Sequence, residues 1–479
     1  MRTAPYHGVV LLQGLSGELA ARTGQLALAR GHADLARVTG KQAMPGHAAK
    51  RVDERKTMPD YENFTTMRSL LVSVGTAMNL VNPDVENHHE QTAYLSYFIA
   101  RELGLPEEDV LLTLYSALLH DIGSIVVEQP QSVAEIERNA REVSLVGSRM
   151  LGDLPYFEDV ANVIGFSQSG WHDTVRCAIE EGSSCERLGL IASIVHLADV
   201  VSLLIKPEER VLNQSRRICD VAKACAGSEF SPQAVEAFLR IAEEEYVWMD
   251  LAHNPTFWTY FTGDLRSVSL ADTIVYAKFM SRVIDYRSPF TAMHSAGVAS
   301  AASKLAELAG MSEPDLMKME IAGHLHDIGK LAVPRKILEK PGKLTNEEFN
   351  IVKEHPYYTS LVLYPVEGFR DIWFWASRHH EKLNGRGYPF HTVGDALDTG
   401  ARLMAVADIF SAITEERPYR SGMSRKQVES VLSDNVHNGA ICGDIVSLLL
   451  ENYDEVDGVR DKYSRIAGKR YFDSMGTAA

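Results

Sequence analysis

The chain has 479 residues, 45% of them hydrophobic, and a formal net charge of −16. This length predicts two or three domains. Such an acidic protein is not expected to bind DNA or RNA duplexes, and an anionic substrate would need a local cationic pocket, a metal ion or both.

Residues 1–57 are rich in Ala, Gly and Arg and resemble no other part of the chain. Two interpretations stay open: a disordered leader, or translation that truly starts at Met58. No signal peptide opens the chain, and the five cysteines form no CxxC pair. We therefore expect reduced thiols and a cytoplasmic location. The longest apolar stretch, residues 190–205, contains His196 and Asp199, which argues against a membrane span.

The rest of the chain is an internal duplication. Four segments of the first half match four of the second in the same order: 88–105 with 294–311, 115–123 with 321–329, 196–200 with 405–409, and 230–239 with 441–450. Apolar residues recur every three or four positions in both halves, which predicts helices. We expect an all-α fold of two tandem helical bundles, with domains at 58–255 and 268–479 and a linker at 256–267.

Seven metal-binding side chains recur at the motif positions of the second half: His294, His326, Asp327, His355, His379, His380 and Asp408. Imidazoles and carboxylates without thiolates suit iron, manganese, nickel or zinc. Seven ligands are too many for one ion with open positions, but they suit two ions. Asp327, next to His326, is the natural bridge between them.

The densest motif runs from His379 and His380 to a Gly-rich turn closed by Pro389. Neighbouring helical side chains diverge by about 100°, so two adjacent imidazoles converge only if something holds them there. Two close metal ions lower the pKa of a shared water and neutralise a phosphoryl group. The pattern therefore predicts phosphoester hydrolysis. Lys330, one turn after Asp327, points to the same side of its helix.

This ordered series of histidines and aspartates, with Gly387-Tyr388-Pro389, resembles the HD superfamily of metal-dependent phosphohydrolases. The second half resembles its HD-GYP branch. The resemblance implies a bacterial signalling enzyme that hydrolyses cyclic di-GMP to the linear dinucleotide pGpG, to GMP, or to both. Similar members act on cyclic GMP–AMP, and a catalytically inactive cyclic-dinucleotide receptor that signals through protein contacts is a further alternative. A homodimer or a signalling-protein partner is left open.

Residue by residue, the resemblance assigns the seven side chains above to two divalent ions, with iron or manganese favoured over nickel or zinc. Asp327 and Lys330 would be catalytic, Lys330 by contacting the phosphate. Further candidate substrate contacts are Arg386, Tyr388, Arg417 and Arg420, although internal packing of Tyr388 and surface or ion-pair roles for the arginines stay open. Members with a third ion carry a carboxylate where this chain has Phe290, so we expect two.

The first half looks degraded. A vestigial metal site would comprise His88, His120, Asp121, His172 and Asp199. The sequence match sets Glu142 opposite His355 and Ser124 opposite Lys330, so the second ion's ligands and the phosphate-binding lysine are missing. Three interpretations follow: a regulatory or structural pseudo-domain, a separate site with one metal ion, or a core in which these groups bond one another.

Overall fold

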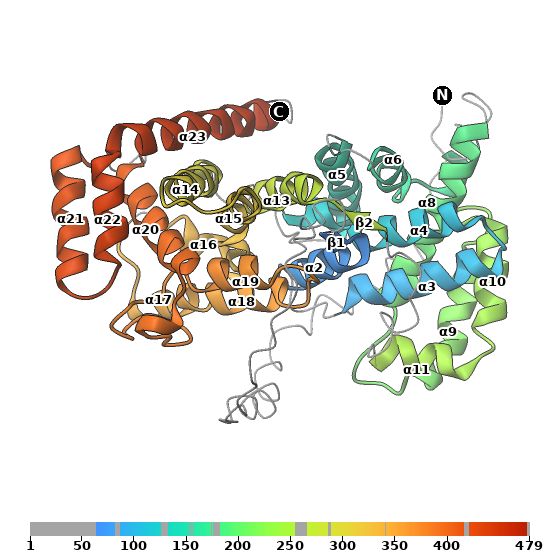
Figure 1. Ribbon diagram of the computed structural model, residues 1–479. Helices are drawn as coiled ribbons and strands as arrows, with labels where there is room; N and C mark the ends of the chain where they lie inside the picture. The colour runs from blue at the N-terminus through green and yellow to red at the C-terminus, as the bar shows by residue number, and fades with distance from the viewer. Residues whose placement is uncertain are drawn as a thin grey trace, which may run out of the picture.

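The computed structural model is built from helices, as predicted. It describes residues 64–81, 87–125, 133–152, 154, 157–173, 175, 183–253, 266–285, 289–340, 342–415 and 421–476. The leader 1–57 and nearly all of the expected linker lie outside these residues. Figure 1 shows two helical bundles side by side, with α2 and α13 between them.

The first bundle holds the first half of the duplication. Its helices are α3 (His88–Glu102), α4 (Glu107–Leu119), the 3-10 helix η3 (Ile122–Ile125), α5 (Val133–Gly152), α6 (Glu158–Phe166), α8 (Ser183–Leu203), α9 (Val211–Ala224), α10 (Pro232–Ile241) and α11 (Glu245–His253). Helices α3, α4 and α8 pack on one another and form its centre. Each of the three presents buried apolar residues to the others, which places His88 and His120 inside the bundle.

The second bundle repeats this order with one helix divided. Its helices are α14 (Pro289–Leu308), α15 (Glu313–Leu325), η4 (Ile328–Ala332), α16 (Arg335–Leu338), α17 (Asn346–Lys353), α18 (His355–Leu363), α19 (Arg370–Ser377), η5 (Gly394–Ala396), α20 (Thr399–Thr414), α21 (Arg425–His437), α22 (Gly443–Glu451) and α23 (Tyr453–Gly476). Local sequence sets several of the starts. Thr345 caps α17 in a capping box with Glu348, and Asp398 caps α20.

Two helices join the bundles. Helix α2 (Met67–Asn79) packs on α3 and α4 of the first bundle and on η4 and α18 of the second. It faces α13 (Leu270–Asp285), where the Tyr276 and Ser73 hydroxyls lie 2.6 Å apart. The strands before them, β1 (Thr65–Thr66) and β2 (Ser267–Val268), pair antiparallel. The start of the first half is therefore built into the contact between the halves.

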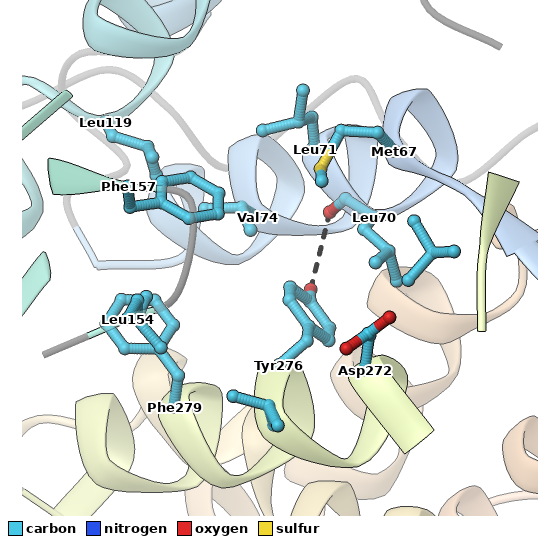
Figure 2. Close-up of a pocket in the computed structure, with 12 residues that line it drawn as sticks. Met67, Leu70, Leu71, Val74, Leu119, Leu154, Phe157, Asp272, Tyr276 and Phe279 are labelled. Carbon is cyan, nitrogen blue, oxygen red and sulfur yellow. Dashed lines mark hydrogen bonds between the residues drawn. The ribbon is translucent and has the colours of Figure 1, made fainter. Parts of the chain in front are cut away.

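An apolar pocket lies at this junction. Figure 2 shows Leu70, Leu71 and Val74 of α2 on one side and Tyr276 and Phe279 of α13 on the other. The Tyr276 hydroxyl also donates a hydrogen bond to the Leu70 carbonyl oxygen, 3.3 Å away, so this hydroxyl in the lining has partners within the protein.

The cysteine prediction is partly wrong. Cys185 is disulfide-bonded, whereas Cys219, Cys225 and Cys442 are free thiols. Among the described residues, every helix is too short or too polar to cross a membrane.

In each bundle a glycine of the short 3-10 helix lies against the backbone of a later helix. This close crossing shows which residues of the two bundles are equivalent. A Cβ at Gly329 of η4 would lie 1.9 Å from the His355 carbonyl oxygen at the start of α18. A Cβ at Gly123 of η3 would lie 2.0 Å from the Val143 carbonyl oxygen in α5. Only glycine allows the backbones to approach so closely. His355 and Val143, which are 212 positions apart, therefore occupy equivalent places.

We predict that Gly329→Ala lowers the free energy of unfolding by about 3 kcal/mol, because backbone atoms of α18 cannot yield to the added methyl group. The matched control is Gly458→Ala in α23, where no atom lies within 4 Å of the added Cβ. The control should gain about 1 kcal/mol from helix propensity. Thermal unfolding of both variants measures the difference, and an unchanged midpoint for Gly329→Ala would contradict the close crossing.

Candidate metal centre

Five elements of the second bundle bring all seven predicted ligands to one place. His294 comes from α14, His326 and Asp327 from the end of α15, and His355 from the start of α18. His379 and His380 follow α19, and Asp408 lies on α20. All seven side chains are buried except that of His380, which is 28% exposed. The centre therefore opens to solvent on the His380 side.

Asp327 lies in the middle of the centre. Its Oδ1 is 3.3 Å from Nε2 of His355 and 3.9 Å from Nε2 of His379. Its Oδ2 is 3.3 Å from Nε2 of His326 and 3.9 Å from Nε2 of His294. Each carboxylate oxygen therefore faces a different pair of imidazoles, which is the geometry of a bridging ligand.

Asp408 forms a second link between the two sides. Its Oδ1 is 3.1 Å from Nε2 of His294, and its Oδ2 is 3.6 Å from Nδ1 of His380. The donors thus fall into two groups that share Asp327. Group one is His294, His326 and Asp408, and group two is His355, His379 and His380.

The backbone fixes which nitrogen each buried imidazole offers. Nδ1 of His326, His355 and His379 lies 2.6–2.8 Å from the carbonyl oxygen three residues earlier. A carbonyl only accepts, so Nδ1 carries the hydrogen and Nε2 keeps its lone pair for the centre. Nε2 of His326 is buried without a hydrogen bond among the described residues.

Group two in particular demands a cation. Nε2 of His355 and Nε2 of His379 lie 3.1 Å apart, and both carry lone pairs. Burial lowers the pKa of both imidazoles, so neither takes up a proton that could bridge them. Burial also lowers the pKa of neighbouring His380 to about 3. The residues therefore fit a divalent ion, which binds neutral imidazole.

The carboxylates are held ionised. Burial would raise the pKa of Asp327, but His326 and Lys330 outweigh it and hold the pKa well below its usual value. Burial likewise opposes ionisation of Asp408, and the hydrogen bond with His294 helps to reverse that effect and lower its pKa. Lys330 donates a hydrogen bond from Nζ to Oδ2 of Asp327, and 19% of its side chain is exposed. The predicted phosphate-binding lysine thus lies beside the predicted bridge.

The turn after His380 is anchored by Glu381. This buried carboxylate accepts hydrogen bonds from the backbone N–H groups of Phe390, at 2.7 Å, and Thr392, at 3.0 Å. Gly387 is required because its Cβ would lie 2.4 Å from Cα of Glu381. The loop therefore folds back over Glu381 and sets the Tyr388 ring 4.9 Å from the His380 ring.

The remaining predicted contacts are spread more widely. Arg386 is exposed, and Tyr388 is half-buried. Arg417, Arg420 and the Phe290 side chain lie outside the described residues. The sequence prediction missed Glu415, a buried carboxylate whose Oε2 is 3.7 Å from Nδ1 of His294. Its signal was present, because Glu415 follows Asp408 by two helical turns.

The first bundle keeps group one alone. Nε2 of His88 lies 3.2 Å from Nε2 of His120 and 3.1 Å from Oδ1 of Asp199. Asp121 lies 3.5 Å from His120. Burial lowers the pKa of His120, but Asp121 and Asp199 outweigh it and raise it to about 10. A proton can therefore take the place of an ion here, unlike at group two.

The vestigial assignment of His172 is wrong. His172 is exposed and belongs to none of the potential ligand clusters among the described residues. Val143 and His355 are 212 positions apart and occupy equivalent places. The same spacing relates two turns: Phe157 N–H donates to the Leu154 carbonyl oxygen, and Phe369 N–H donates to the Val366 carbonyl oxygen. It sets Ser167 at the place of His379 and Gln168 at that of His380.

Hydrogen bonding supports this correspondence. Gln168 donates to Oδ2 of Asp199 at 3.2 Å, as His380 faces Oδ2 of Asp408. Group two is thus replaced by valine, serine and glutamine. The sequence prediction also missed His89, which clusters with His120 and Asp121 and whose doublet with His88 was the available signal.

Comparisons with known proteins agree with this geometry. The HD domain family matches residues 278–438 and, separately, residues 85–204. A 3'3'-cGAMP-specific phosphodiesterase 1 of Vibrio cholerae is 27% identical over 81% of this chain and 91% of its own length. The cyclic di-GMP phosphodiesterase response regulator RpfG of Xanthomonas campestris is 40% identical over 29% of this chain and 38% of its own length.

A solved structure shares the fold of both bundles. The crystal structure of a cyclic GMP-AMP specific phosphodiesterase of V. cholerae, V-cGAP3, covers 81% of this chain and 98% of its own, with a TM-score of 0.57 and 24% identity. Two successive family matches, the shared fold and the ordered ligand series place the chain in the HD superfamily, with two HD domains of which the second carries the HD-GYP motif.

Proposed function

We propose that the second bundle is a cytoplasmic, metal-dependent phosphodiesterase that hydrolyses a cyclic dinucleotide. The observation that carries the proposal is Asp327, whose two oxygens face separate pairs of imidazoles. The two groups would hold two divalent ions, iron or manganese before nickel or zinc, which supply Lewis-acid activation of water and neutralise phosphoryl charge.

The protein's own groups prepare the reaction. The carbonyl oxygens of Gly323, Val352 and Ala376 fix the imidazoles before substrate arrives. Preorganised charge of this kind stabilises a transition state without reorganisation. Lys330 holds a positive charge beside Asp327 and can turn from that carboxylate to a phosphoryl oxygen.

Two substrates are supported to a similar degree. The resemblance to the HD-GYP branch implies cyclic di-GMP, cleaved to pGpG, GMP or both, and relatives 40% identical over short stretches are named for cyclic di-GMP. The relatives that align over 81% and 66% of this chain are named for 3'3'-cGAMP. We propose one of these two molecules as the substrate.

The first bundle is proposed to be regulatory or structural, because it lacks group two and has Ser124 in place of Lys330. Its contact with the second bundle runs through α2, which packs on η4, the element that carries Lys330. An inactive cyclic-dinucleotide receptor is the competing function for the whole chain. The complete ligand set in the second bundle disfavours it, and binding without turnover by a metal-loaded protein would favour it.

We predict that Asp327→Ala loses both ions and at least about 1000-fold in turnover, because a single change removes an oxygen from each group. Metal content by mass spectrometry and hydrolysis of both cyclic dinucleotides measure this. Asp395→Ala, which alters an exposed carboxylate in η5, is the control and should match the unchanged protein. An Asp327→Ala protein with full metal content and substantial turnover would contradict the proposal.

Equivalent histidines of the two bundles should behave differently. We predict that His326→Ala abolishes turnover, whereas His120→Ala, the same position in the first bundle, leaves a folded and active enzyme. Circular dichroism and kinetics of the full chain test this. If folded His120→Ala protein is inactive, the first bundle takes part in the chemistry.

A side-by-side panel decides the substrate. We predict that the manganese- or iron-loaded full chain cleaves cyclic di-GMP or 3'3'-cGAMP with a kcat/KM at least about tenfold above that for the other, since the two differ by base-edge groups that a site can read. Chromatography distinguishes pGpG from GMP. Hydrolysis of neither molecule, with both ions confirmed, would refute the proposed function.

A further inference from the structure

An aromatic residue at the rim of the metal centre has no role in the core. Helix α17 buries none of its residues. Phe349 on this helix is 46% exposed, and its ring meets the Tyr388 ring edge-on, with centroids 6.4 Å apart at 80°. Folding gains little from so exposed a ring, and the exposed part of the ring is open to a ligand.

Phe349 is connected to the centre through a short series of contacts. The Tyr388 ring lies 6.4 Å from Phe349 on one side and 4.9 Å from the ring of His380, the most exposed of the seven, on the other. Phe349 therefore lies at the edge of the side on which His380 is exposed.

A cation lies on the same edge. Nζ of Lys353 is 5.4 Å from the centre of the Tyr388 ring. Phe349 and Lys353 are four residues apart on one helix and so share a face. A flat apolar ring beside an ammonium group is a surface that suits a nucleobase and its phosphate.

The first bundle lacks this combination where it lacks group two. In the sequence, the positions 212 residues before Phe349 and Lys353 are Glu137 and Arg141. At these positions the first half keeps a cationic residue but has no aromatic residue.

We propose that Phe349 and Lys353 form a purine-phosphate subsite, in which Phe349 stacks on one base of the substrate and Lys353 pairs with the phosphate that is not at the metals. The inference rests on the proposed function. A cyclic dinucleotide has two bases and two phosphates, and only one phosphate can occupy the centre at a time. Lys330 serves the phosphate at the centre and Lys353 the other.

Phe349→Ala should raise KM for the cyclic dinucleotide about tenfold and leave kcat within about twofold, because stacking contributes to binding rather than to bond cleavage. Phe349→Trp should restore KM. Ile351→Ala is the matched control, since Ile351 is 37% exposed on the same helix but two residues away, on another face. Lys353→Met should raise KM and weaken its dependence on salt.

A binding experiment separates this inference from the proposed function. Calorimetry would measure the dissociation constants of GMP and of ribose 5-phosphate for the metal-loaded full chain. GMP should bind about tenfold more tightly than ribose 5-phosphate, because only GMP has a base that can stack. Phe349→Ala should remove that difference and leave ribose 5-phosphate unchanged. A GMP preference that survives Phe349→Ala would overturn the subsite, even if cyclic dinucleotides are hydrolysed. If Phe349→Ala removes the preference for GMP but the unchanged protein hydrolyses neither cyclic dinucleotide, the subsite stands and the proposed function is refuted.

Discussion

Buried imidazole nitrogens that face one another are the constraint on which the second bundle depends. Backbone carbonyl oxygens hold the Nδ1 hydrogens of His355 and His379, so their Nε2 lone pairs meet at 3.1 Å. Burial keeps both rings unprotonated. Only a cation makes this arrangement favourable. The helix break before His355, the turn after His380 and the anchor at Glu381 all serve to place these groups.

The first bundle shows what remains when that constraint is relaxed. His88, His120 and Asp199 keep the geometry of group one, but His120 can hold a proton there. Val143 lies within the continuous helix α5, whereas the equivalent His355 lies at the break between α17 and α18. Loss of a ligand and recovery of a continuous helix thus go together. Helix α2 still packs on both this bundle and η4, which gives the first bundle a direct contact with the element that carries Lys330.

The sequence predicted the helical fold, the duplication and the gathering of seven side chains, because ordered motifs identify ligands without knowledge of packing. The sequence prediction was wrong or incomplete for residues whose position depends on tertiary packing. His172 was matched to His380 by its residue type, while the glycine crossing at Gly123 and Gly329 shows that Gln168 holds that place. The role of Glu381 depends on a loop folding back, and the rim at Phe349 depends on two segments meeting in space. Neither leaves a periodic signal.

We propose that Asp327 would be shared by two ions in the second bundle. Anomalous diffraction from crystals of the manganese-loaded protein tests it most directly. Two peaks are expected in the second bundle, about 3.5–4 Å apart, one beside each oxygen of Asp327. A single peak, or two peaks that share no carboxylate, would contradict it.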